Sequence, residues 1–199
     1  MTGKTHMAVG VGIALSLLHT KDIKVIIGGT VLALIGSIIV DIDTEKSKGS
    51  KLVGEIFVTL VIVLLLGVFL RIKYNVNTLG YITANKSIMQ MTPALLILLA
   101  FVGLGKLSTH RTFTHSLIGI VAFTIPIYML VGPLYIWFLI GYGVHIIADL
   151  LNKKNVRLFY PIKGGVSLGL CSADGVVDKI LFCIFLFIIA TFYIHVVQL

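Results

Sequence analysis

Long apolar runs with almost no charged side chains are the feature that most constrains how this chain folds. Clusters of Lys, Asp, Asn, Gly and Pro separate them. The seven runs cover residues 7–18, 25–40, 56–70, 94–105, 116–131, 134–148 and 180–197. The mean hydropathy is +1.08 and only 12% of the residues are charged, against about 25% in a soluble domain. We therefore expect an all-α, polytopic transmembrane helical bundle of about seven apolar helices, forming a single domain over residues 1–199.

Several of these runs are short for membrane crossings. They hold 12 to 16 apolar residues, whereas a helix needs about 20 to span about 30 Å of hydrocarbon. Some helices are therefore expected to be short or re-entrant, and the first two runs form either full crossings or a buried hairpin that crosses only in part. Thr92-Pro93 predicts the start of a helix, and Gly132-Pro133 predicts a tight turn between two helices.

The positive charges predict how the bundle is oriented. If every run crosses, the N-terminal side of the membrane holds residues 1–6, 41–55, 106–115 and 149–179, with eleven of the 16 Lys and Arg residues. Because cytoplasmic loops carry the excess of Lys and Arg, we expect an inner-membrane protein with its N-terminus in the cytoplasm and its C-terminus outside. The net charge of +8 has the same explanation, so we expect no nucleic-acid partner.

The same partition sorts the residue types that bind metals. The N-terminal side receives seven of the eight carboxylates and four of the six histidines. The candidate metal ligands are His6, Asp41, Asp43, His110, His115, His145 and Asp149. A polar site at one mouth of a helical bundle would produce this sorting. The alternative, that acids merely lie in the longer loops, explains Glu45 and Glu55 but not His145 or Asp149, which lie in or beside helices.

Two spacings carry specific predictions. His145 and Asp149 are four residues apart, so on a helix they project from one face, either as two ligands of one metal or as an Asp that holds the tautomer of a His. His110 and His115 are five residues apart at the start of a helix, so at least one must approach the site from loop backbone. Arg111 lies between them. Its guanidinium either binds a phosphate or carboxylate through two hydrogen bonds, or extends to the membrane interface.

The other candidates are weaker on their own. Asp41 and Asp43 end the second run, where they either bridge two cations or form a solvated turn. His6 opens the first helix, where the helix dipole helps to keep an imidazole neutral and able to bind metal. Asp178, at the head of the last helix, is a further ligand, a general base, or a charge that favours the helix N-terminus.

Seven candidate ligands exceed the four that a tetrahedral zinc ion needs. Mixed imidazole and carboxylate ligands suit one or two divalent transition metals, with zinc favoured and manganese or iron also compatible. Such a site activates water and clamps the oxygens of a phosphoryl or acyl group, so the expected reaction is hydrolysis. We assign catalytic roles to Asp43, Arg111 and Asp178.

Five pieces of the sequence together resemble one known family, the LexA-regulated, inner-membrane, metal-dependent hydrolases of bacteria. They are Thr5-His6, Asp41-Ile42-Asp43, and the segments His110 to Ser116, Gly143 to Asp149 and Val156 to Pro161, which span essentially the whole chain. The most specific part is His-Arg-x-x-Thr-His-Ser followed by His-x-x-x-Asp. Where the family tends to carry a Glu near the start of the last helix, this chain has Asp178. The resemblance implies a membrane-bound hydrolase and leaves its substrate open.

The sequence therefore predicts a metal-dependent hydrolase at the cytoplasmic mouth of the bundle, acting on a lipid or amphiphile, with a phosphoester as the favoured bond. Two other functions stay open. Intramembrane His and Asp also mark ion paths, so the chain is alternatively a metal or proton transporter. A closed site would instead make the metal a structural staple. The expected partners are the bilayer and a lipid-like substrate, and the sequence predicts no particular oligomeric state.

Overall fold

A computed structural model describes residues 1–199 except 45–47, 75–85 and 198–199. The helices are α1 (Gly3–Leu17), α2 (Ile23–Ile39), α3 (Lys48–Tyr74), α5 (Lys86–Leu107), α6 (Leu117–Val131), α7 (Tyr135–Leu150) and α8 (Val176–Val197). Two 3₁₀ helices, η1 (Val40–Asp43) and η2 (Gly132–Leu134), extend α2 and join α6 to α7. The predicted all-α fold is confirmed, and each apolar run coincides largely with one of the helices.

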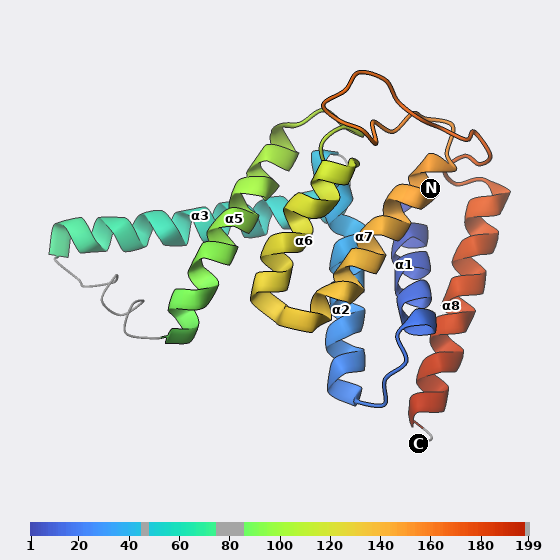
Figure 1. The fold of residues 1–199 in the computed structure, drawn as a ribbon, viewed down its shortest axis with the longest axis horizontal. Coiled ribbons are helices and arrows are strands. Elements are labelled where there is room, and N and C mark those ends of the chain that lie inside the picture. The colour runs from blue at the N-terminus through green and yellow to red at the C-terminus, as the bar shows by residue number, and fades with distance from the viewer. Residues whose placement is uncertain (45–47, 75–85, 198–199) are drawn as a thin grey trace.

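Three helical stretches of the described chain are long and apolar enough to cross a membrane. They are Ile23–Asp43, Leu117–Leu150 and Val176–Val196. The second is a hairpin of α6 and α7 that reverses at η2 (Figure 1). Gly132 has a φ of +59° there, which a residue without a Cβ adopts without strain. The predicted tight turn is therefore confirmed.

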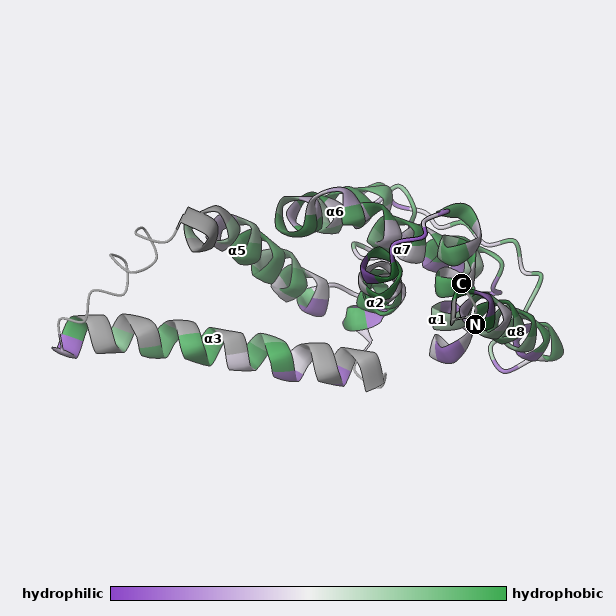
Figure 2. Ribbon diagram, turned by 90° about the horizontal axis from the view of Figure 1, so that it is seen from below, coloured by the Kyte–Doolittle hydropathy of each residue, from purple (hydrophilic) through white to green (hydrophobic). Residues whose placement is uncertain are grey.

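The outward faces of these helices are apolar, as the green colour of α6 and α8 in Figure 2 shows. Large side chains such as Ile27, Val121 and Phe187 are more than half exposed. An exposed apolar surface of this extent suits contact with lipid rather than with water.

Small residues let α2 and α7 pack backbone to backbone at the centre of the bundle. A Cβ on Gly36 would clash with the backbone oxygen of Phe138, and a Cβ on Gly141 would clash with the backbone of α2. Gly10 of α1 lies against Ser37 and Gly141 in the same region. Close approach through small residues is a common way to join membrane helices. It brings the end of α2 against the last turns of α7.

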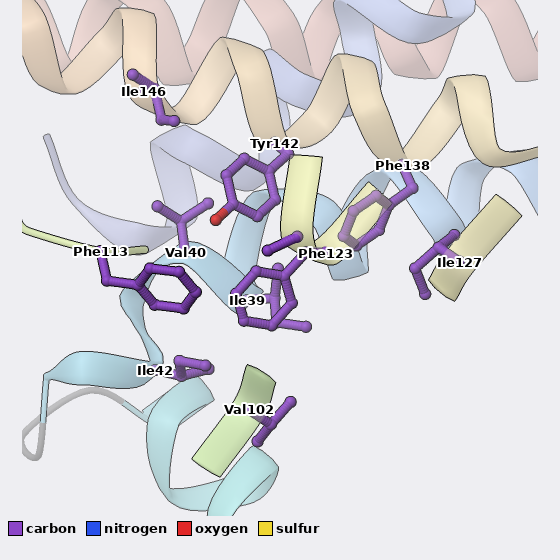
Figure 3. Packing of buried hydrophobic residues seen from close by; sticks show 11 residues of the cluster. Ile39, Val40, Ile42, Val102, Phe113, Phe123, Ile127, Phe138, Tyr142 and Ile146 are labelled. Carbon is purple, nitrogen blue, oxygen red and sulfur yellow. The ribbon is translucent and has the colours of Figure 1, made fainter. Parts of the chain in front are cut away.

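An aromatic cluster packs around the other side of α7 (Figure 3). Phe123, Phe138 and Tyr142 are fully buried, and Phe113 is nearly so. The Tyr142 hydroxyl donates a hydrogen bond of 2.5 Å to the backbone carbonyl of Thr114. Because Thr114 lies in the segment between α5 and α6, this hydrogen bond fixes that segment against α7.

Two features differ from the sequence predictions. Helix α3 forms as expected but lies crosswise to α2 and extends away from the bundle, with contacts to η1, α2 and α5 (Figures 1 and 2). Helix α5 begins at Lys86 and contains Pro93, so the helix start predicted at Thr92-Pro93 is wrong. A proline removes only one backbone N–H from a helix, and apolar surroundings favour keeping the remaining hydrogen bonds.

The segments that carry the candidate ligands meet at one end of the bundle. The start of α1, the end of η1, residues 108–116, the end of α7 and the start of α8 lie together at the top of Figure 1. The last residues of α8 lie at the opposite end. In the described part of the chain, the segments that carry the predicted ligand residues therefore lie at one end of the bundle.

Replacing Gly36 by Ala is expected to destabilise the bundle, because the added methyl group meets backbone atoms of α7. Overpacking of this kind costs about 1–3 kcal/mol. Gly28→Ala is the matched control in the same helix, since nothing lies within 4 Å of a Cβ there. Thermal unfolding in detergent compares the two, and a Gly36→Ala protein as stable as the control would contradict the close packing.

Candidate metal centre

Six of the seven predicted ligands form two adjacent groups. The groups are His6, His145 and Asp149, and Asp41, His110 and His115. Within each group, one ligand atom from every residue lies within 4.8 Å of the others. The first group comes from α1 and α7, and the second from η1 and the segment before α6. Folding therefore gathers ligands from four separate parts of the chain.

Two carboxylates lie between the imidazole rings of both groups. The Asp149 Oδ1 atom is 3.4 Å from Nε2 of His6, and its Oδ2 atom is 3.3 Å from Nε2 of His115. The Asp41 Oδ1 atom is 3.5 Å from Nε2 of His115 and 3.6 Å from Nε2 of His145. Tetrahedral ligands about 2.0–2.1 Å from a zinc ion lie about 3.3–3.4 Å from one another. These separations therefore suit atoms that share a cation.

His145 is oriented as a metal ligand. Its Nδ1–H donates a hydrogen bond of 2.6 Å to the carbonyl of Ser37. Because a carbonyl only accepts, this bond leaves the lone pair on Nε2. Nε2 of His145 and Nε2 of His115 are both buried without a hydrogen-bond partner in the described chain. A buried polar atom without a partner costs free energy, and a metal ion would satisfy both atoms.

Asp43 binds the segment before α6 and belongs to neither ligand group. Its Oδ1 atom accepts a hydrogen bond of 2.9 Å from Nδ1 of His110. Its Oδ2 atom accepts from the backbone N–H of Arg111 at 3.0 Å and from the Thr114 hydroxyl at 2.9 Å, and it lies 3.4 Å from Nδ1 of His115. A carboxylate at the far nitrogen of a ligating His orients the ring. These contacts favour a positioning role, and the predicted ligand and catalytic roles of Asp43 stay predictions.

Arg111 lies inside the site. Its side chain is only 10% exposed, and Nη2 is 3.0 Å from Oδ2 of Asp149. Nη1 donates a hydrogen bond of 2.6 Å to the carbonyl of Lys154. The φ of Arg111 is +65°, and such left-handed conformations of residues other than Gly concentrate at functional sites. The alternative, extension to the membrane interface, is therefore wrong, because the guanidinium is held beside a ligand carboxylate.

Negative charge surrounds His115, which lies in the turn before α6. Burial lowers the pKa of its imidazole, but Asp149, Asp41 and Asp43 raise it by more, to about 10. Three carboxylates around one ring form a site that a cation would balance. Only a neutral imidazole binds metal, so a metal ion at Nε2 would displace the proton.

Asp178 lies apart from both ligand groups. Its carboxylate accepts hydrogen bonds from the backbone N–H groups of Thr2 at 3.1 Å and Asp174 at 3.0 Å. The Thr5 hydroxyl donates to the Asp178 carbonyl at 3.4 Å. These contacts tie α8 to the start of α1 and agree with a carboxylate that favours a helix N-terminus. The predicted catalytic role of Asp178 stays a prediction.

Ser37 and Thr114 complete the site, although sequence reasoning did not identify them. Ser37 acts through its backbone carbonyl, which every residue has, so no signal in the sequence marks it. The Thr114 hydroxyl lies 3.0 Å from Nδ1 of His115 in addition to its bond to Asp43. The only sequence signal for Thr114 is its place between His110 and His115.

The sequence profile of the YdjM inner membrane protein family matches residues 1–198. This match includes every residue of the two ligand groups and confirms the resemblance to an inner-membrane family. Among curated proteins and solved structures, nothing matches the chain.

Purified protein is expected to carry one or two equivalents of a divalent transition metal, and His145→Ala or His115→Ala should remove at least one. Loss of a metal ligand should weaken metal binding more than loss of a residue that only hydrogen-bonds to a ligand, which typically costs roughly 10–100-fold in affinity. His19→Ala is the matched control, because His19 is exposed and belongs to neither ligand group. Elemental analysis of the purified variants measures the loss. Wild-type metal content in both site variants would show that the cluster is only a polar core.

Proposed function

The chain belongs to the YdjM inner membrane protein family, and we propose that it is a multi-pass, metal-dependent hydrolase of a lipid or amphiphilic phosphoester. The catalytic site would lie at the cytoplasmic mouth of the helical bundle. One observation carries the proposal. Within the described residues, the buried Nε2 atoms of His115 and His145 have no hydrogen-bond partner, and they lie 3.5 and 3.6 Å from Oδ1 of Asp41.

The chemistry follows from what each side chain offers. The two ligand groups suit one or two divalent ions, zinc first and manganese or iron next. A bound ion would polarise a phosphoryl oxygen and lower the pKa of a bound water. His145, held by the Ser37 carbonyl, would bind through Nε2. Arg111 would neutralise a second phosphoryl oxygen, since its guanidinium is always charged and forks onto pairs of oxygens.

A transport function is less well supported. A conduit needs polar groups through the middle of the membrane. The buried His, Arg and Asp residues of the described chain are His6, Arg111, His115, His145, Asp149 and Asp178. All six lie on the segments that meet at the ligand end of the bundle. Phe123, Trp137 and Phe138 are buried farther along the helices, which favours a site at one mouth over a continuous path.

A purely structural metal staple is also less well supported. Structural metal sites are closed, whereas catalytic sites keep one position open. The side chains of His110 and Asp41 are 40% and 24% exposed, whereas those of His145 and Asp149 are 0% and 3% exposed. The second ligand group is therefore open on one side, where water and a substrate can approach.

Detergent-solubilised protein is expected to hydrolyse an amphiphilic phosphoester only when metal is present. His115→Ala and Asp149→Asn should lower the rate by more than about 100-fold while the protein stays folded, because each removes a predicted ligand. Glu55→Gln is the matched acid control, because Glu55 is exposed and belongs to neither ligand group. Released inorganic phosphate would indicate a phosphatase, and a released phosphorylated head group would indicate cleavage of the phospholipase C type.

The outcome that contradicts the enzyme proposal is specific. Metal-loaded protein would cleave neither class of phosphoester, while proteoliposomes containing it would move Zn²⁺ or Mn²⁺ across the bilayer. That pair of results would replace the hydrolase with the transporter.

We further expect the N-terminus to lie in the cytoplasm and the C-terminus outside. The segments that the count of crossings assigns to the N-terminal side hold eleven of the 16 Lys and Arg residues, and the last residues of α8 lie at the end of the bundle opposite the start of α1. Alkaline phosphatase fused after Leu199 should be active, and the same enzyme fused after Asn152 should be inactive. The reverse pattern would turn the metal centre toward the outside and contradict the cytoplasmic site.

A further inference from the structure

A cavity of about 900 Å³ lies beside the metal centre, between the first turns of α1, the end of α2 with η1, and the first turns of α8. Ligand pockets commonly have volumes of roughly 300–1,000 Å³. We call this cavity the α1–α2–α8 groove. Asp41 lies on its wall, so one member of the second ligand group faces into it. The groove therefore leads directly to the proposed catalytic site.

The groove is polar at one end and apolar below it. Each of its three walls has a charged residue near the helix end and an apolar residue three positions deeper. These pairs are Lys4 and Met7 in α1, Asp41 and Ile38 in α2 with η1, and Lys179 and Phe182 in α8. Three residues correspond to about 4.5 Å along a helix. A molecule with a polar head and an apolar tail fits this order.

Two lysines and three carboxylates line the groove, and the lysines are the groups that an anionic head group would contact. Lys4 and Lys179 both line the groove and are exposed. Lys179 lies 4.0 Å from Asp174, but both side chains are exposed, and such surface pairs are worth little. Asp178 already accepts hydrogen bonds from backbone N–H groups. The two lysines are therefore placed to bind an incoming phosphate.

The position of the groove favours entry from the bilayer. Helices α2 and α8 both pack on α1, and they meet each other through a hydrogen bond of 2.6 Å between the hydroxyl groups of Thr30 and Tyr193, away from the residues that line the groove. The groove lies between them. Their neighbouring outer faces carry exposed apolar side chains, such as Ile35 of α2 and Ile184 of α8. Exposed apolar side chains of this kind would let a lipid in the surrounding leaflet approach the groove through apolar surroundings.

We infer that the α1–α2–α8 groove binds an anionic phospholipid as the substrate of the proposed hydrolase. Its phosphate lies between Lys4 and Lys179 beside Asp41, and its acyl chain lies along Met7, Ile38 and Phe182. That the bound lipid is a substrate rests on the proposed function, whereas the lipid-binding site itself rests on the groove.

A phosphonate analogue of short-chain phosphatidic acid tests the site, because its carbon–phosphorus bond is not hydrolysed. Isothermal titration of metal-loaded protein in detergent measures its Kd. Lys4→Gln combined with Lys179→Gln should raise the Kd at least about tenfold by removing charge-assisted hydrogen bonds. Lys153→Gln is the control, since Lys153 is exposed and outside the groove.

Phe182→Ala should raise the Kd severalfold through lost contact with the acyl chain. Phe187→Ala is its matched control, because Phe187 lies on the same helix, is 70% exposed, and does not line the groove. Phosphatidylcholine of the same chain length should bind more weakly than the anionic analogue. If the Phe182→Ala protein fails to fold, the double lysine variant still tests the site, because both lysines are exposed and their replacement should not disturb folding.

Three results would overturn the inference. They are an unchanged Kd in the double lysine variant, equal effects of Phe182→Ala and Phe187→Ala, and binding of inorganic phosphate as tight as that of the lipid. The hydrolase proposal fails separately. If the predicted pattern of Kd values appears but no phosphoester is cleaved, the groove is a lipid site without that activity. If cleavage occurs and the double lysine variant cleaves as fast as wild type, the groove assignment is wrong and the hydrolase stands.

Discussion

The buried carboxylate of Asp149 is the charge around which the rest of the site is arranged. It lies on the last turn of α7, 3.4 Å from the ring of His6, 3.3 Å from that of His115 and 3.0 Å from the guanidinium of Arg111. A charge in apolar surroundings is costly unless partners surround it. Those partners come from α1 and from the segment before α6, and Arg111 also reaches the loop after α7 through the Lys154 carbonyl. One carboxylate therefore couples the positions of three parts of the chain.

The packing of α2 on α7 gives this arrangement its precision. Gly36 and Gly141 allow the two backbones to approach, and the carbonyl of Ser37 then meets Nδ1 of His145 at 2.6 Å. A methyl group at either glycine would push the helices apart and would lengthen that hydrogen bond. Stability of the bundle and orientation of His145 thus depend on the same contact, and Gly141 itself accepts a hydrogen bond of 3.4 Å from the Ser37 hydroxyl.

The gathering of these His and Asp residues was predictable from the sequence, because His and Asp are rare in apolar segments and are kept there only with partners. Counting the segments as crossings placed the candidates at one end, and six of the seven fall in the two ligand groups. The hairpin turn was predictable as well, because Gly132-Pro133 is a strong local signal. Local signals of this kind need no knowledge of the tertiary contacts.

Other features depend on tertiary contacts and were not predictable. The role of Ser37 rests on a backbone carbonyl, and the position of Asp43 behind His110 and His115 depends on how the segment before α6 folds. Pro93 looked like a helix start, but α5 continues through it. The run at 56–70 has the composition of a membrane crossing, yet α3 lies crosswise to α2. Composition determines that a helix is apolar, but it does not determine how that helix packs.

We propose that these side chains form a metal centre that faces a lipid-accessible groove. Anomalous X-ray diffraction from crystals of metal-loaded protein, measured on both sides of the zinc absorption edge, tests it most directly. One or two anomalous peaks are expected within bonding distance of Nε2 of His145 and Nε2 of His115. Ordered density for both imidazoles without an anomalous peak between them and Asp41 would contradict it.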